Sequence, residues 1–225
     1  MENKIVPSEA SSRHGLVGPA DLWEAKRRFQ INFLLGVGLK PNHKLLDFGC
    51  GTLRGGLPLI DYLEPDNYYG LDVRIETLKE ACNELEESGL ENKRPTLIHS
   101  NNPSLLTFTG GFDFIWAFSV LIHLADTKLE EFLSFATRNL KPDGKIFANV
   151  VYGEKSDGCW RIFPLVARPQ TFYQYTFLKY GLKICDMGAL REFGHVARPR
   201  PLAQELSQRM LEASLISDPF KSKND

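Results

Sequence analysis

The chain has few of the features that mark membrane, secreted or zinc-binding proteins. Its 225 residues include only four cysteines and no C-x-x-C spacing. Scattered thiols of this kind favour a reducing compartment over a disulfide or zinc framework. No apolar run approaches the ~20 residues that span a bilayer. The start of the chain, Met1 to Pro7, also lacks the apolar segment of a secretory signal. We therefore expect a cytoplasmic protein with no membrane partner.

Net charge is also nearly absent. The 27 basic residues balance 28 acidic ones, giving a net charge of -1 and an isoelectric point near 6.5. This balance argues against a broad electrostatic grip on nucleic acid. Only four arginines near the C-terminal end hint at a basic groove: Arg191, Arg198, Arg200 and Arg209. With 43% apolar and 24% charged residues and no linker or repeat, the sequence predicts one globular domain over residues 1–225.

The most informative segment that is present runs from Lys44 to Gly56. It reads as a buried strand, a glycine turn and a helix start. Gly49 and Gly51 can adopt positive φ and let a ligand approach the backbone, while the N–H groups of the following helix turn are expected to point at that ligand. A dinucleotide site requires G-x-G-x-x-G, and here Arg54 takes the place of the third glycine. A nicotinamide or flavin site is therefore disfavoured.

Strand and helix patterns alternate along the whole chain. Seven strands are predicted, starting near residues 44, 68, 96, 112, 145, 182 and 208, and helices are predicted near 19–35, 53–63, 75–87, 126–139 and 170–179. For the last strand, a helix from Pro201 through Leu211 fits the periodicity equally well. Strands separated by helices predict an α/β fold with a doubly wound, mostly parallel sheet and helices on both faces.

Four segments in order resemble the class I S-adenosylmethionine-dependent methyltransferases, whose fold is Rossmann-like. The first is the acid and glycine pair of Lys44 to Gly56. The others are Tyr68 to Val73, which ends a strand in an acid, Phe112 to Leu124 with a strand and its following loop, and Leu140 to Ala148. Taken singly, the acids could be helix caps and the glycines could serve a tight turn. Their order over residues 43–151 predicts a core that binds S-adenosyl-L-methionine (SAM) and releases S-adenosyl-L-homocysteine (SAH).

The resemblance implies a site for the methionine part of SAM at the first glycine turn. The backbone around Gly49, Cys50 and Gly51 is expected to hold the amino and carboxylate groups, with Asp47 bonded to the ammonium directly or through water. Arg54 either faces the carboxylate or lies on a solvent-exposed helix face.

The resemblance also implies a nucleoside site at the next strand. Asp72 is expected to bind the ribose hydroxyls, and Leu71 and Val73 to pack on the adenine. The family often has an acid after the third strand to meet the adenine amine. Here the candidates are Asn101 and Asn102, whose amide oxygens accept the same hydrogen bond.

The loop after the fourth strand is expected to face the transferable methyl group. Phe118 is predicted to lie near the methionine part of SAM. His123 is the candidate general base, because imidazole titrates near neutral pH, and the alternative is that it only positions the loop. The loop lacks the Asn-Pro-Pro-Tyr pattern used on DNA bases. We expect a small-molecule acceptor methylated on oxygen or nitrogen, and no metal.

The flanking regions complete the predicted enzyme. In residues 1–38, His14 to Pro19 could form a lid before the first helix, an arrangement that resembles a bacterial subgroup of methyltransferases. In residues 152–225, the acceptor side, Trp160, Arg161 and Phe163 are candidate pocket residues or a plain surface loop. A non-catalytic binding module, or a methyltransferase acting on protein or nucleic acid, are the alternative functions. The acceptor and the oligomeric state stay open.

Overall fold

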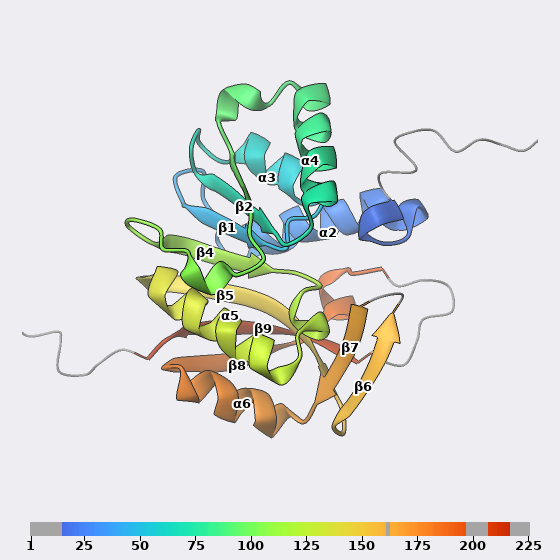
Figure 1. Ribbon diagram of the computed structural model, residues 1–225, viewed down its shortest axis with the longest axis vertical. Helices are drawn as coiled ribbons and strands as arrows, with labels where there is room; N and C mark the ends of the chain where they lie inside the picture. The colour runs from blue at the N-terminus through green and yellow to red at the C-terminus, as the bar shows by residue number, and fades with distance from the viewer. Residues whose placement is uncertain (1–14, 161–162, 197–206, 217–225) are drawn as a thin grey trace, which may run out of the picture.

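The computed structural model describes residues 15–160, 163–196 and 207–216. Its centre is a sheet of nine strands in the order β3-β2-β1-β4-β5-β7-β6, extended by β9 beside β5 and by β8 beside β9 (Figure 1). The described strands are β1 Leu45–Phe48, β2 Tyr68–Asp72, β3 Thr96–His99, β4 Phe112–Ala117, β5 Leu140–Tyr152, β6 Ser156–Trp160, β7 Phe163–Arg168, β8 Leu182–Ala189 and β9 Gln208–Leu215.

The central strands β1 to β5 are parallel. In β1, Asp47 lies opposite Gly70 of β2 and Trp116 of β4, so the carboxyl ends of these three strands meet at one edge. The loops that follow them therefore meet there too, at the point where the strand order reverses. In an open α/β sheet this edge is where ligands bind.

Helices cover both faces of the sheet, as predicted. They are α2 Trp23–Gly36, α3 Gly56–Tyr62, α4 Ile75–Ser88, α5 Asp126–Asn139 and α6 Gln170–Lys179. One apolar core contains side chains of α2, α3 and α4, and the other contains side chains of α5 and α6. Residues alternate between the two cores along a strand: Leu45 points into the first, Leu46 into the second. None of the described helices is long and apolar enough to cross a bilayer.

The predicted count of seven strands was wrong, because a hairpin of β6 and β7 follows β5. The β6 segment, Ser-Asp-Gly-Cys-Trp, contains residues that strands disfavour, and β7 includes Pro164. Tertiary pairing decides here: β7 adds to β5 at Val151 and Tyr152. Since Val151 also pairs with Gln208 of β9, β7 lies on the opposite edge of β5, the edge that β4 leaves after Ala148.

The last strand was predicted correctly. Residues 208–215 form β9, which lies antiparallel between β5 and β8. The residues 201–206 of the alternative helix lie outside the described part. Two helix starts differ from prediction: α2 begins at Trp23, after the short 3₁₀ turns η1 (Gly15–Val17) and η2 (Ala20–Leu22), and α3 begins only at Gly56.

The β6–β7 hairpin is fixed to the start of α5 by one buried cation. Arg168 pairs with Asp126 at 2.8 Å and with Asp157 at 2.6 Å, and its side chain is only 4% exposed. Arg168→Met should lower the free energy of unfolding by ~1–3 kcal/mol, because two charge-assisted contacts are lost while both carboxylates stay partly hydrated. Hydrogen exchange should accelerate in β6 and β7.

The matched control is Lys179→Met, which breaks a surface pair with Glu130. Its effect should stay within ~1 kcal/mol, with no change in hairpin exchange. Equal effects of the two substitutions would show that Arg168 does not hold the hairpin.

Candidate functional site

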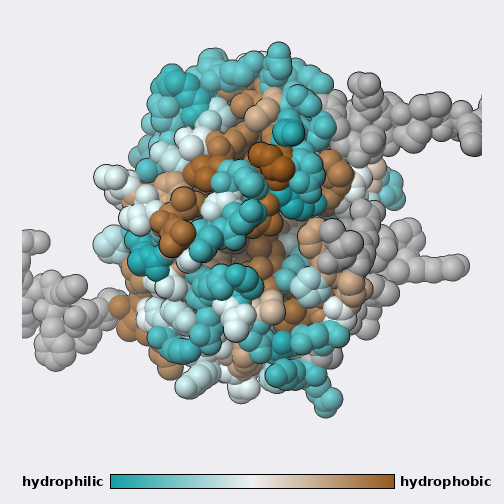
Figure 2. Space-filling view, viewed as in Figure 1, coloured by the Kyte–Doolittle hydropathy of each residue, from teal (hydrophilic) through white to brown (hydrophobic). Residues whose placement is uncertain are grey.

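A cavity of about 530 Å³ lies at the carboxyl edge of β1, β2 and β4. It is lined by the segment before α2, the turn after β1, the loops after β2, β3 and β4, and parts of α5, β7 and β9. Figure 2 shows hydrophilic residues over most of one face of the molecule, with hydrophobic residues gathered in a band between α4 and α5. Of the residues predicted to bind SAM or to act as the base, all except Asn102 line this one cavity.

The glycine turn is bonded to the end of β2. The N–H groups of Gly49 and Cys50 both donate to the carbonyl of Leu71, at 2.7 and 3.1 Å, and that of Gly51 donates to Asp72 Oδ2 at 2.9 Å. These three N–H groups are therefore engaged within the fold, and the expectation about N–H groups that point at a ligand concerns the helix turn that follows them. The hydrogen-bond acceptors of the three groups are Leu71 and Asp72 at the end of β2. The helix α3 has seven residues and starts five residues after Gly51, at Gly56.

The two glycines are required for close approach. Gly49 and Gly51 have φ of +83° and +58°. A Cβ on Gly49 would collide with Val120 of the loop after β4, and a Cβ on Gly51 would lie 2.6 Å from Val17. Glycine therefore lets two other cavity walls close on the turn.

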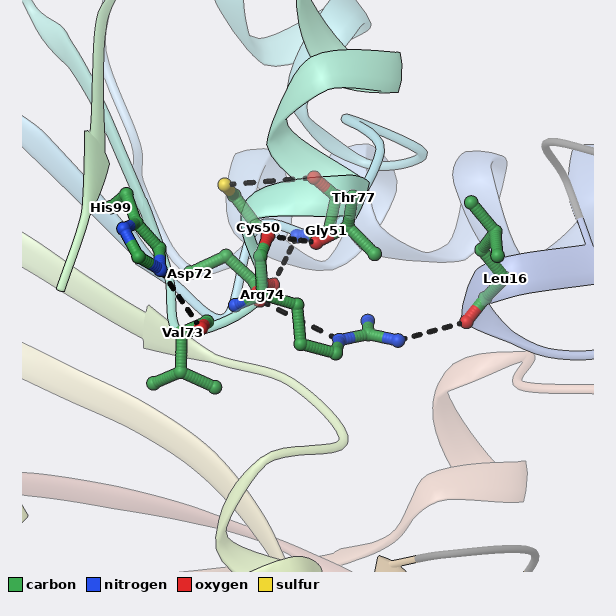
Figure 3. A network of polar contacts seen from close by, with 8 residues as sticks. All are labelled: Leu16, Cys50, Gly51, Asp72, Val73, Arg74, Thr77 and His99. Carbon is green, nitrogen blue, oxygen red and sulfur yellow. Dashed lines mark hydrogen bonds and ion pairs between the residues drawn. The ribbon is translucent and has the colours of Figure 1, made fainter. Parts of the chain in front are cut away.

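Two arginines hold the segment before α2 over the turn. Arg74 donates to the carbonyl of Leu16 at 3.2 Å, and Arg54 donates to that of Val17 at 2.8 Å. Arg74 is held in turn by Asp72, whose Oδ1 accepts its backbone N–H at 2.9 Å (Figure 3). The part of the predicted lid from Gly15 to Pro19 thus lies against the cavity, whereas His14 is outside the described residues.

Asp47 is a buried carboxyl at the end of β1. It accepts a hydrogen bond from the Tyr68 hydroxyl at 2.7 Å. Burial raises the pKa of Asp47 to about 7, although the bond from Tyr68 opposes the rise. At neutral pH the carboxyl is close to half-ionised, and a cation beside it would complete its ionisation.

Arg54 places a buried cation on the same side of the cavity. Burial lowers its pKa to about 10, so the guanidinium stays charged at neutral pH. Its Nε is buried with no hydrogen-bond partner among the described residues. The preceding Leu53 has φ of +60° without being glycine, a strained conformation at the turn that carries this cation.

The residues predicted to bind the nucleoside do not all line the cavity. Leu71, Val73 and Asn101 line the cavity. Asn102 lies outside the cavity lining, and its side-chain oxygen accepts the hydroxyl of Ser104. Only one of the two asparagines is therefore placed to meet a ligand.

His123 lies in the 3₁₀ turn η5 (Leu121–His123) after β4 and lines the cavity. Its Nδ1 donates to the carbonyl of Pro164 at 2.6 Å, and its ring lies 5.5 Å from that of Phe163. Burial lowers the pKa of His123 below its ordinary value, so the ring is neutral at neutral pH. Because a carbonyl only accepts, Nδ1 carries the hydrogen and Nε2 carries the lone pair.

Gln30, His195 and Gln208 are among the cavity residues that were not predicted. Gln30 accepts the indole N–H of Trp116 at 3.0 Å, and its place in the apolar stripe of α2 is the signal that could have found it. His195 packs against Phe118, with ring centroids 5.6 Å apart. Burial, and to a lesser extent the positive charges of Lys26 and Arg54, lower the pKa of His195 to about 4. Neither His195 nor Gln208 carries a local sequence signal.

The hairpin supplies part of the wall. Phe163 and Leu165 of β7 line the cavity. Of the other candidates in this region, Arg161 and the side chain of Trp160 are outside what the structure describes. Within the described residues, no cluster of histidine, cysteine, aspartate or glutamate could hold a metal ion.

The part of the chain that forms much of this site is similar to known proteins. Residues 46–146 match the family described as methyltransferase domain. This match covers less than half of the chain, and it says what this segment is similar to. The matched residues include the glycine turn, Asp72 and the loop after β4.

Solved structures share the fold at low sequence identity. The magnesium protoporphyrin IX methyltransferase of Synechocystis, solved with SAM, is 17% identical over 84% of this chain and 79% of its own, with a TM-score of 0.61. A glycopeptide N-methyltransferase solved with SAH is 14% identical over 86% and 90%, with a TM-score of 0.64. A SAM-dependent methyltransferase from Clostridium acetobutylicum is 14% identical over 86% and 92%, with a TM-score of 0.63. These likenesses show that the chain shares the fold of these proteins, in agreement with the family match over residues 46–146.

The residues present fit SAM by their chemistry. The amino-acid end of SAM carries an ammonium and a carboxylate, and the cavity offers the buried Asp47 carboxyl and the buried Arg54 guanidinium. The ribose requires hydrogen-bond acceptors, which Asp72 provides at the end of β2. The adenine requires apolar contact, which Leu71 and Val73 provide.

The raised pKa of Asp47 predicts a pH-dependent stability. Its folded-state value of about 7 exceeds the ordinary 3.8, so between these values the folded protein keeps a proton that the unfolded chain has released. The free energy of unfolding therefore falls as pH rises from about 4 to 7, by up to ~1.4 kcal/mol per pH unit for this group. Asp47→Asn should remove this fall and stabilise the protein at neutral pH.

Urea unfolding across this pH range measures the effect. Asp61→Asn, on the exposed side of α3, is the matched control. A stability difference between wild type and Asp47→Asn that does not change with pH would contradict the assignment.

Proposed function

We propose that this enzyme transfers a methyl group from SAM to an oxygen or nitrogen of a small-molecule acceptor. One observation carries the proposal: a single cavity joins two buried carboxylates and a buried guanidinium to an apolar wall with two histidines. The charged groups match a zwitterionic nucleoside, and the apolar remainder suits an organic acceptor. A pocket of about 530 Å³ is in the range that binds small molecules.

The cofactor end is assigned residue by residue. Asp72 accepts from the ribose hydroxyls, Asp47 from the ammonium, and Arg54 faces the carboxylate. Leu71, Val73 and Asn101 then hold the adenine. When bound, SAM supplies a methyl group already activated on a sulfonium. The protein has to hold the acceptor in line with that bond and to exclude water.

The structure offers less support for a nucleic-acid or protein acceptor than for a small molecule. A basic groove would have to use the arginines near the C-terminus, and Arg209 is engaged by Asp186, with a nitrogen–oxygen distance of 3.0 Å. Arg198 and Arg200 lie outside the described residues. The segment Gly15 to Pro19 lies against the cavity, and a covered pocket favours a small acceptor of the kind expected for the bacterial subgroup. The four cysteines form no disulfide bonds, as suits a cytoplasmic enzyme.

His123 is the proposed general base. It lines the cavity as a neutral ring whose Nδ1 hydrogen is fixed by Pro164, which is the tautomer that a base acting through Nε2 requires. The same bond also braces the hairpin against the loop after β4. The two roles use different nitrogens, so different substitutions can separate them.

The cofactor assignment predicts the effect of Asp72→Ala. The variant should bind SAM and SAH ~5–150-fold more weakly, because the ribose loses charge-assisted bonds and the Gly51 turn loses its acceptor. Calorimetry measures both affinities, and Asp61→Ala is the control with unchanged binding. An unchanged affinity in a folded Asp72→Ala variant would move the ribose site elsewhere.

The base assignment predicts that two different substitutions of His123 have the same effect. His123→Asn can still donate an N–H toward Pro164 but has no basic nitrogen, whereas His123→Ala loses both functions. If His123 is the base, both lower the rate of methyl transfer by ~10²–10⁴-fold with SAM affinity nearly unchanged. The wild-type rate should fall as pH drops through the imidazole pKa, and this limb should vanish in both variants.

A screen of hydroxyl and amine acceptors must precede this measurement. Activity retained by His123→Asn and lost by His123→Ala would assign His123 to bracing alone. The absence of turnover with every acceptor, together with intact SAM binding, would favour a non-catalytic module.

A further inference from the structure

A chain of buried amides crosses from the loop after β4 to β9. The backbone N–H of Ser119 donates to Asn149 Oδ1 at 2.6 Å, and Asn149 Nδ2 donates to Gln208 Oε1 at 2.8 Å. Asn149 is fully buried, and Gln208 is 8% exposed and lines the cavity. None of these three residues is a predicted cofactor contact.

The direction of every amide in this chain is fixed by its first member. A backbone N–H can only donate, so Asn149 must turn its oxygen to Ser119 and its nitrogen to Gln208. Gln208 must then turn its oxygen to Asn149. Its remaining polar atom is the nitrogen Nε2, a donor, and no described residue accepts a hydrogen from it. The fold thus presents an oriented N–H donor at the cavity.

The position of Gln208 in the sheet separates it from the cofactor residues. It pairs with Val151 near the end of β5, at the level where the β6–β7 hairpin also joins β5. Asp72 and Asn101 belong to the opposite half of the sheet, at β2 and after β3. Phe163 of that hairpin lines the same cavity, and the Arg74 guanidinium lies over its ring.

Backbone strain at Ser119 supports a functional use of the chain of amides. Ser119 has φ of +58°, which is costly for a residue that is not glycine, and the bond to Asn149 holds it there. Gln208 comes from the end of the described chain and reaches the cavity only because β9 lies beside β5. A buried amide ladder of this kind rigidifies the group at its end.

We propose that Gln208 positions the acceptor by donating its amide N–H to a carbonyl or carboxylate oxygen beside the atom that is methylated. This rests on the proposed function and narrows its substrate class. An amide donor carries no charge, so it selects for an oxygen acceptor without requiring an anion. The bond would fix the acceptor relative to His123, which lines the same cavity.

The test measures the binding of matched probes to protein saturated with SAH. Salicylamide and anthranilamide carry a carbonyl beside the hydroxyl or amine, and phenol and aniline lack it. Each carbonyl-bearing probe should bind wild type about tenfold more tightly than its partner, as expected for one hydrogen bond. Salicylate tests whether a carboxylate serves as well. Gln208→Glu should abolish the preference, since its carboxylate has no N–H to give.

A second variant tests the fixed direction of the amides. Asn149→Asp still accepts from Ser119 but no longer donates, so Gln208 must reverse to donate to it and will present its oxygen to the cavity. The preference for carbonyl probes should therefore be lost with Gln208 still in place. Gln174→Glu, on the exposed face of α6, is the matched control and should keep the preference.

Each outcome decides the proposal. NMR identifies the side-chain amide signals of Gln208 as those that disappear in Gln208→Glu. These signals should shift when salicylamide is added to the wild-type complex with SAH, and should not shift when phenol is added. Equal binding within each pair, no binding of any carbonyl-bearing probe, or an unchanged preference in Gln208→Glu would overturn it. Failure of wild type to bind SAH would instead overturn the cofactor assignment, so the two proposals fail separately.

Discussion

The carboxylate of Asp72 is the contact on which the site depends. It is buried at the end of β2, and it accepts N–H groups from Gly51 on one side and from Arg74 on the other (Figure 3). Through Gly51 it fixes the glycine turn after β1, and through Arg74 it reaches the carbonyl of Leu16 in the segment before α2. One charge therefore holds three walls of the cavity, and the same charge is proposed to receive the ribose. The carboxylate proposed to bind the cofactor is thus the one that holds this segment in place.

The cavity is divided by charge. The half beside β1 and β2 carries Asp47, Asp72 and Arg54, whose charges match those of a zwitterionic nucleoside. The half beside β5 and β9 carries neutral polar groups, among them a histidine whose pKa is lowered by burial and the oriented amide of Gln208. Burial lowers the pKa of the histidine because it penalises ions that lack a partner. Burial also keeps the amide of Gln208 oriented because it strengthens hydrogen bonds between neutral groups. The cofactor and the acceptor are proposed to divide the cavity along the same line.

Prediction from sequence succeeded where one short segment contains the whole signal. The strand ending in Asp47, the glycines after it and the strand ending in Asp72 lie within thirty residues and were found from their order. It failed for β6 and β7, whose residues disfavour strands and which pair only because β4 ends early and leaves an edge of β5 open. It gave no indication that β2 engages the N–H groups of the glycine turn itself.

The sequence by itself determined the alternation of strands and helices, which follows from local periodicity. It also predicted the cofactor class and the candidate residues of the cofactor half, because motifs of fixed spacing indicate them. The tertiary structure alone decided which residues join the predicted His123 in the acceptor half. His123, His195 and Gln208 are separated by up to 85 residues, and each is placed by strand pairing or loop packing. Their tautomers, pKa values and amide directions depend on neighbours distant in the chain, such as Pro164 for His123 and Asn149 for Gln208. Contacts of that kind leave no pattern in a single sequence, since each partner is chosen by the register of the sheet.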